Sequence, residues 1–218
     1  NLTYASVEFR NTSNSKIINN TVSSNNWYGI DLWYSDNNII ANNTVSNNYD
    51  GIVLCYSSNN TIANNIASSN NYYGIAIWDS SNNIIANNTV SNNDDGIDIA
   101  YSSNNNIIAN NTVSSNNWYG IVLYGTNNII ANNNISSNYY SGICLGSSNN
   151  TITNNTVSNN WYGIDLYGTN NIIYLNNFID NTHQFPSYAY DSKNIWNSTE
   201  KINYTYNGKQ FTNYLGNY

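Results

Sequence analysis

Few residues of this chain could do chemistry, and the best acidic cluster is Asp94, Asp95 and Asp98. Paired carboxylates are the groups that cleave glycosidic bonds, and carboxylate oxygens are also the ligands that Ca²⁺ prefers. The cluster leaves three interpretations open: a weak catalytic candidate, a weak Ca²⁺ site, or a solvated acidic surface. We favour the surface.

A second acidic set recurs along the chain. Asp31, Asp98 and Asp165 each follow a Gly-Ile pair, in the first, fourth and seventh repeats described below. Three strand spacings would place neighbouring members about 14 Å apart. That separation is too large for two carboxylates to cooperate, so we expect no catalytic site.

The two cysteines, Cys55 and Cys144, lie four repeats apart. Four strand spacings are about 19 Å, whereas a disulfide needs Cα atoms within about 7 Å. We therefore expect no disulfide within one subunit and two free thiols. Pairing between subunits is the alternative.

These residues belong to a sequence that repeats about every 22 residues. The pattern Asn-Asn-x-Ile-x-x-Asn, or a close variant of it, recurs eight times, and Gly-Ile recurs in phase with it from Gly29 to Gly163. The isoleucines that we take as equivalent are Ile18, Ile40, Ile62, Ile85, Ile108, Ile130, Ile152 and Ile173. A repeat this short, rich in β-branched residues and Asn, is typical of one coil of a solenoid.

Alternation within each repeat predicts three short strands per coil, with residues such as Ile40, Val45 and Ile52 facing inward. Gly51 would permit either a bend with positive φ or close packing. The fold predicted for residues 1–179 is all-β: a right-handed parallel β-helix of about eight coils, the hand following that of parallel crossovers.

Asparagines at the corners predict a buried ladder in which each side-chain amide bonds its counterpart one coil away. The residues assigned to this ladder are Asn19, Asn42, Asn64, Asn87, Asn110, Asn132, Asn154 and Asn176.

The lines Asn-Asn-x-Ile-x-x-Asn and Gly-Ile-x-Leu resemble the right-handed β-helix repeats of the carbohydrate-binding and sugar-hydrolase (CASH) superfamily. They are similar in particular to its NosD-like branch, which is common in archaeal surface proteins. The tail segments Asn194–Asn197 and Leu215–Tyr218 also resemble the end of such proteins. The family name implies copper, but copper binds Cys, Met or His, and this chain has no Met, one His and two distant Cys. We expect no cofactor.

Residues 180–218 break the repeat. Two β-prone runs flank Asn207-Gly208, a strong signal for a type I′ hairpin. Before them lies a stretch of loop-like composition that contains His183, Pro186, Tyr188, Tyr190, Asp191, Trp196 and Glu200. We expect this tail to cover the last coil.

The other end of the chain has no capping helix, although Leu2, Tyr4, Val7 and Phe9 predict a strand in register with the first coil. An uncovered end exposes unpaired backbone groups. Either a segment upstream of Asn1 or a second copy must therefore cover this end. The partner that we expect is a second copy, stacked head to tail in an open polymer.

Composition excludes several classes of protein. A net charge of −7 with only five basic residues makes nucleic acids and anionic membranes poor partners. No apolar run approaches the roughly 18 residues of a membrane span. Only 8% of residues are charged, as in some disordered chains, but regular Ile, Val and Leu with 14% aromatics supply a core to every repeat.

Aromatic residues precede six of the seven Gly-Ile pairs. The predicted interaction surface is Trp27, Tyr28, Tyr49, Tyr72, Tyr73, Trp118, Tyr119, Tyr140, Trp161 and Tyr162. A second band follows the third strand of each coil: Trp33, Tyr34, Tyr56, Trp78, Tyr101, Tyr124 and Tyr167. Such rows can stack on one another, bind a protein, or stack on sugar rings.

Several Asn-x-Ser/Thr sequences could carry glycans in an extracellular protein. The outward candidates are Asn59, Asn134, Asn149, Asn197 and Asn203. We exclude Asn42, Asn87, Asn110 and Asn154 because they are assigned to the buried ladder.

These observations together predict a non-enzymatic, extracellular structural protein: a glycosylated, self-associating subunit of a cell-surface layer, sheath or filament. The first alternative is a carbohydrate-binding or adhesion module that uses Trp27, Trp118 and Trp161. The second is a polysaccharide hydrolase or lyase that uses Asp94, Asp95 and Asp98.

Overall fold

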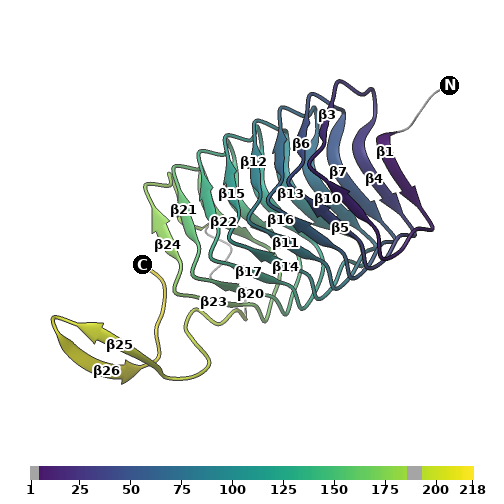
Figure 1. The fold of residues 1–218 in the computed structure, drawn as a ribbon. Helices are drawn as coiled ribbons and strands as arrows, with labels where there is room; N and C mark the ends of the chain where they lie inside the picture. The colour runs from purple at the N-terminus through teal and green to yellow at the C-terminus, as the bar shows by residue number, and fades with distance from the viewer. Residues whose placement is uncertain (1–4, 186–192) are drawn as a thin grey trace.

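The computed structural model describes residues 5–185 and 193–218, which form a long parallel β-helix followed by a hairpin (Figure 1). Leu2, Tyr4, Pro186, Tyr188, Tyr190 and Asp191 lie outside the described residues. Each coil contributes one strand to each of three parallel sheets, so the predicted fold class is confirmed. Within the described part of the chain, no helix is long and apolar enough to cross a membrane.

Every sheet has eight strands. Sheet A consists of β1 (Ala5–Arg10), β4 (Tyr28–Trp33), β7 (Asp50–Cys55), β10 (Tyr73–Trp78), β13 (Asp95–Ala100), β16 (Tyr119–Leu123), β19 (Ser141–Leu145) and β22 (Tyr162–Leu166). Sheet B consists of β2 (Lys16–Ile18), β5 (Ile39–Ala41), β8 (Thr61–Ala63), β11 (Ile84–Ala86), β14 (Ile107–Ala109), β17 (Ile129–Ala131), β20 (Thr151–Thr153) and β23 (Ile172–Tyr174).

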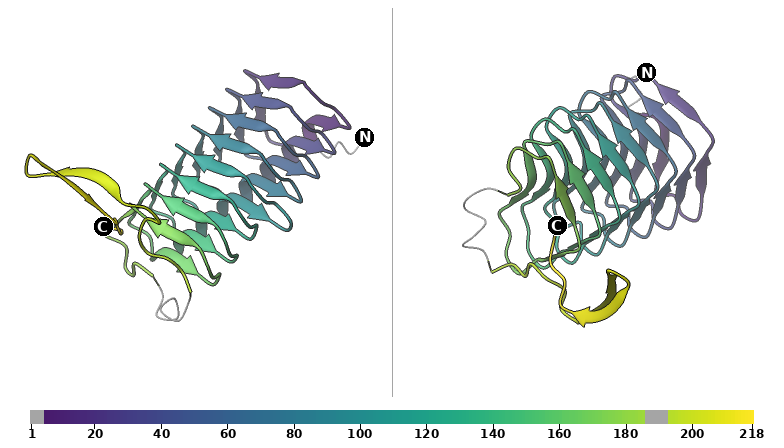
Figure 2. Two further views of the ribbon diagram at one scale, coloured as in Figure 1. Left: turned by 90° about the horizontal axis from the view of Figure 1, so that it is seen from below. Right: turned by 90° about the vertical axis from the view of Figure 1, so that its left-hand side faces the viewer.

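Sheet C consists of β3 (Thr21–Ser23), β6 (Thr44–Ser46), β9 (Ile66–Ser68), β12 (Thr89–Ser91), β15 (Thr112–Ser114), β18 (Asn134–Ser136), β21 (Thr156–Ser158) and β24 (Asn177–Ile179). Coils are numbered here by their sheet A strand, so β1 begins coil 1 and β22 begins coil 8. The two further views in Figure 2 show the coils stacked along one axis.

Equivalent apolar residues stack from coil to coil inside the helix. In sheet B, Ile40, Ile62 and Ile85 pair in register and are fully buried. In coil 1 the residue that stacks on Ile40 is Ile17, whereas Ile18 pairs with Ala41 and is exposed. The assignment of Ile18 to the core was therefore wrong by one residue, because Ile18 takes the place that Ala41 has in the next coil.

The predicted asparagine ladder is displaced by one residue in seven of its eight positions. Asn42 has a φ of 56° and is exposed, and the same left-handed conformation recurs in the others: Asn19, Asn64, Asn87, Asn110, Asn132 and Asn154. Asn tolerates this conformation better than other residues with a side chain, so it makes the corner. The following residue then points inward. Asn176 alone was assigned correctly, because Leu175 takes the left-handed position in coil 8.

The true ladder at this corner joins each coil to the next through two kinds of hydrogen bond. Asn65 donates from its backbone N–H (2.9 Å) and from Nδ2 (3.0 Å) to Oδ1 of Asn88. Its members are Asn20, Asn43, Asn65, Asn88, Asn111, Asn133, Asn155, Asn176 and Asn217. Since Asn42, Asn87, Asn110 and Asn154 are exposed, burial gives no reason to exclude their glycosylation.

The column of glycines at the start of the sheet A strands serves close packing. Gly208 is the only glycine with positive φ among the described residues. Of the two roles predicted for Gly51, the bend with positive φ is therefore wrong. A Cβ on Gly51 would lie 2.3 Å from the carbonyl oxygen of Gly74. The corner between sheets C and A therefore has no room for a side chain.

Replacing Gly96 with Ala should destabilise the helix by about 1–3 kcal/mol or more, the cost of overpacking a dense core. The new Cβ would lie 2.4 Å from the Gly120 carbonyl oxygen and 2.6 Å from Cγ1 of Val113. Denaturant unfolding would measure the change. Thr112→Ala, at an exposed position of β15, is the control, and equal midpoints for the two variants would contradict the packing argument.

The tail covers the last coil only in part. Asn217 extends the ladder by accepting from the backbone N–H (3.1 Å) and Nδ2 (2.9 Å) of Asn176, and Trp196 packs against the core. Strands β25 (Ile202–Tyr206) and β26 (Lys209–Asn213) form the predicted hairpin, with Asn207 and Gly208 at φ 49° and 74°. The hairpin itself projects away from the helix (Figures 1 and 2).

Candidate functional site: the outer face of sheet A

The outer face of sheet A carries three rows of side chains that run along the helix axis. The central row is Glu8, Asp31, Val53, Ala76, Asp98, Val122, Cys144 and Asp165, all paired in register. Seven of these eight residues, all but Glu8, are buried although they point away from the core of the helix. Something on the outside must therefore cover them.

Two flanking rows provide the cover. The tyrosine row is Ala5, Tyr28, Asp50, Tyr73, Asp95, Tyr119, Ser141 and Tyr162. The tryptophan row is Arg10, Trp33, Cys55, Trp78, Ala100, Tyr124, Gly146 and Tyr167. From coil 2 onward, even-numbered coils carry an aromatic residue in both rows and odd-numbered coils carry a small or acidic one.

The alternation has a steric cause. Strands lie about 4.8 Å apart, so a ring that lies over the sheet takes the space of two coils. In coil 4 the rings of Tyr73 and Trp78 meet edge to face, with centroids 5.6 Å apart. They pack over Val53 and Ala76, both fully buried. The small residues of the odd coils give the rings this space.

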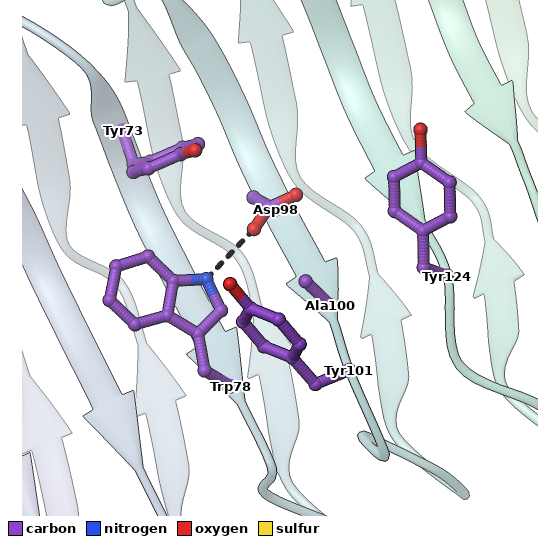
Figure 3. Close-up of a pocket in the computed structure, with 6 residues that line it drawn as sticks. All are labelled: Tyr73, Trp78, Asp98, Ala100, Tyr101 and Tyr124. Atoms are coloured by element: carbon purple, nitrogen blue, oxygen red, sulfur yellow. Dashed lines mark hydrogen bonds between the residues drawn. The ribbon is translucent and has the colours of Figure 1, made fainter.

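The cover opens at Asp98. A cavity of about 440 Å³, which we call the Asp98 cavity, is lined by Tyr73, Trp78, Asp98, Ala100, Tyr101 and Tyr124. It exists because Ala100 leaves a gap in the tryptophan row between Trp78 and Tyr124. Figure 3 shows the Asp98 carboxyl group between the Trp78 and Tyr73 rings on one side and the Tyr124 ring on the other.

The Asp98 carboxyl group is held and perturbed by its surroundings. The indole Nε1 of Trp78 donates a hydrogen bond of 2.9 Å to Oδ2 of Asp98. Burial raises the pKa of Asp98 to about 6, although this hydrogen bond opposes the shift. A carboxyl group with such a pKa changes its protonation near neutral pH and can donate or accept a proton there.

The predicted acidic cluster does not form one site. Asp98 lines the cavity, but Asp95 lies in the tyrosine row, where its Oδ1 accepts a hydrogen bond of 3.2 Å from the backbone N–H of Tyr119. Burial raises the pKa of Asp95 to about 7. Asp94 is only half-buried and does not line the cavity. In the described residues, no group of three or more His, Cys, Asp or Glu could hold a metal ion.

Asp31 and Asp165 occupy the same row as Asp98 but are engaged elsewhere. Asp31 is fully buried, and its Oδ2 lies 3.2 Å from Nη2 of Arg10. Asp165 accepts a hydrogen bond of 3.1 Å from the hydroxyl group of Tyr167. Each therefore stands in its own environment, separated from Asp98 by other coils.

The predicted interaction surface divides into two parts. Tyr28, Tyr73, Tyr119 and Tyr162 belong to the half-buried tyrosine row. The remaining residues form an outer column at the corner between sheets C and A: Trp27, Tyr49, Tyr72, Trp118, Tyr140 and Trp161. Rings of this column contact one another, as between Tyr49 and Tyr72 at 4.9 Å.

Near the C-terminal end, the outer column forms a second aromatic cavity. Trp118, Tyr139, Tyr140 and Trp161 line a volume of about 510 Å³, which we call the corner cavity. It lacks a carboxyl group among its lining residues. Its role in binding a protein or a glycan stays a prediction, as does glycosylation of the exposed Asn59, Asn134, Asn149, Asn197 and Asn203.

Three solved structures with the same fold process carbohydrates. The A-module of mannuronan C-5 epimerase AlgE4 from Azotobacter vinelandii is 20% identical with a TM-score of 0.70, over 81% of this chain and 53% of that one. A mutant of the periplasmic alginate epimerase AlgG is 22% identical with a TM-score of 0.68, over 84% and 48%. An alginate lyase from Paenibacillus is 16% identical with a TM-score of 0.60, over 80% and 77%. The chain thus spans about half the length of the two epimerase chains.

The family model described as periplasmic copper-binding protein (NosD) matches residues 1–123 and residues 67–218. No curated protein matches the chain. The predicted function, a structural subunit of a surface layer, sheath or filament, is contradicted, because the three similar structures above are carbohydrate-processing enzymes and the family is described as copper-binding. The archaeal origin that the resemblance implies gains no support from these matches, nor do the predicted glycosylation and self-assembly.

The residues of this chain do not suit copper. Copper prefers Cys, Met and His ligands, and the sequence has no Met and a single His, His183. Cys55 and Cys144 are buried, free and in different rows. Burial raises the pKa of each thiol to about 12, so neither offers a thiolate at neutral pH.

Proposed function

We propose that this chain, which belongs to the NosD family, binds a polysaccharide on the outer face of sheet A, with one sugar residue in the Asp98 cavity. The observation that carries the proposal is a buried carboxyl group on the floor of an aromatic-walled cavity. Aromatic rings offer flat apolar faces to the C–H groups of a sugar ring. The carboxylate oxygens accept hydrogen bonds from its hydroxyl groups.

The charge of the site favours a neutral glycan. None of the residues that line the Asp98 cavity is a Lys or Arg, and the chain carries a net charge of −7. Arg10, the only arginine, is paired with Glu8 and Asp31. An anionic polymer such as alginate, the substrate named for the similar structures, would be repelled here. We also infer a location outside the cytoplasm, in line with the periplasmic description of the family.

Affinity electrophoresis with soluble neutral polysaccharides, such as glucomannan and mixed-linkage glucan, tests the proposal. Trp78→Ala should weaken binding about tenfold or more, because it removes a ring contact and the donor to Asp98. Trp118→Ala, which alters only the corner cavity, is the matched control. The proposal fails if Trp118→Ala abolishes binding and Trp78→Ala does not, or if alginate binds more tightly than the neutral polymers.

Acid–base processing of the bound glycan is the second candidate function, favoured by the pKa of about 6 at Asp98. If Asp98 acts as a base, turnover should rise with pH through about 6, since its carboxyl group then loses its proton. Asp98→Asn should abolish turnover and leave binding nearly unchanged, because the amide keeps an oxygen to accept from Trp78. Assays for new reducing ends and for unsaturated products on the same polymers would measure the turnover. Turnover that persists in Asp98→Asn would rule out this role.

A further inference from the structure

We infer that the binding face is a groove of two subsites spaced two coils apart, which fits an extended neutral glycan in which every second sugar residue enters a cavity. This inference rests on the proposed function and names the form of the ligand. It comes from a second cavity on sheet A that repeats the architecture of the Asp98 cavity.

The second cavity, which we call the Cys55 cavity, has a volume of about 350 Å³. Its floor is Cys55, the small residue of the tryptophan row in coil 3, between Trp33 and Trp78. The Asp98 cavity has Ala100 of coil 5 in the equivalent place, between Trp78 and Tyr124. The two cavities are neighbours, because Trp78 and Tyr101 line both.

The remaining walls correspond in the same way. Tyr28 and Tyr73 close the two cavities from the tyrosine row. At the opposite edge, Tyr56 and Tyr101 occupy the left-handed position that directly follows the sheet A strand, with φ of 48° and 58°. Both rings stand exposed to solvent. A displacement of two coils therefore superimposes the rings and the small floor residue of one cavity on those of the other. Asp79 and Tyr101 are additional walls of the Cys55 cavity.

The distance between subsites selects the ligand. Two strand spacings amount to about 9.6 Å, which is close to the length of two sugar rings in an extended chain. A polymer with a two-fold screw, in which successive rings turn opposite faces to the sheet, would present the same face to both cavities. A strongly coiled glycan would lose register after the first subsite.

Both ends of the groove are closed. In coil 7 the equivalent small residue is Gly146, but the Tyr124 ring lies over it: a Cβ there would be 2.2 Å from Cε1 of Tyr124. At the other end the Arg10 guanidinium group lies 5.1 Å from the centre of the Trp33 ring. Two cavities therefore stay open, and a ligand of about four sugar residues fills the groove.

The two subsites differ in chemistry. The residue of the central row that corresponds to Asp98 in the Cys55 cavity is Val53, which is fully buried and apolar. The floor of the Cys55 cavity therefore offers no buried carboxyl group, although the half-buried Asp79 lies among its walls. The buried carboxyl group of Asp98 acts on one sugar residue of the chain. This asymmetry lets the subsites be tested separately.

Calorimetric titration with cello- and manno-oligosaccharides of two to six residues provides the test. We expect affinity to rise about tenfold or more from the disaccharide to the tetrasaccharide, and little beyond. Cys55→Phe should fill the Cys55 cavity and remove this gain while disaccharide binding is retained. Tyr56→Gly, at an exposed left-handed position that lines only the Cys55 cavity, should have the same effect without a risk to folding.

The outcomes separate the two proposals. If the unaltered protein binds none of these oligosaccharides, the proposed function fails. If it binds them with an affinity that does not depend on length, or if Tyr56→Gly leaves the length dependence unchanged, the two-subsite groove fails while the Asp98 cavity remains the binding site.

Discussion

Replacing Asn88 with Ala will lower the free energy of unfolding by about 2–4 kcal/mol, the cost of lost hydrogen bonds and an orphaned buried donor. Oδ1 of Asn88 accepts both from the backbone N–H of Asn65 and from its Nδ2. Nδ2 of Asn65 keeps a second acceptor, the carbonyl oxygen of Ile40 at 2.9 Å. The backbone N–H of Asn65 would be left buried and unpaired.

The neighbouring asparagine supplies the control. Asn87 is exposed and has a φ of 56°, so Asn87→Gly keeps the corner conformation and should leave stability nearly unchanged. Urea unfolding of the two variants beside the unaltered chain would separate the roles of the two residues. A larger loss of stability for Asn87→Gly than for Asn88→Ala would place the ladder at Asn87, the residue predicted from the sequence.

That contrast shows how far the repeat determines the fold. The alternation within each repeat predicted the three strands per coil, and the asparagines between the strands marked the corners. It did not determine which Asn of each pair faces inward, because both have the composition of a corner. The left-handed conformation of Asn42 determines which Asn faces inward, because it turns the next side chain, that of Asn43, into the interior.

The Asp98 cavity was harder to predict, because its walls come from residues separated by about 23 or 46 positions in the sequence. Trp78, Tyr101 and Tyr124 were recognised as an aromatic band, but the alternation with Cys55, Ala100 and Gly146 was missed. That alternation is visible at the residue after each Gly-Ile-x-Leu segment or its equivalent. Asp98 points outward and is buried only by rings from the neighbouring coil. The sequence of its own repeat does not contain those rings.

Raising the pH from about 4 to about 8 will destabilise this protein, because several carboxyl groups of the outer face are buried. Burial raises the pKa of Asp50 and of Asp98 from 3.8 to about 6. Asp31 and Asp95 shift in the same direction. Between the unfolded and folded pKa values the folded chain binds more protons, so its stability is greatest below about pH 4 to 5 and falls as these groups ionise.

The effect is large enough to assign to single residues. A rise in the pKa of one carboxyl group from 3.8 to about 6 corresponds to about 3 kcal/mol. Asp50→Asn should therefore stabilise the chain at pH 8 and have little effect at pH 4, since the amide oxygen can still accept from the backbone N–H of Tyr73. Asp180→Asn, the same substitution at an exposed position after β24, is the matched control. Thermal unfolding between pH 4 and 8 measures both, and a melting temperature that rises with pH in this window would show that these carboxyl groups are stabilised as anions by the fold.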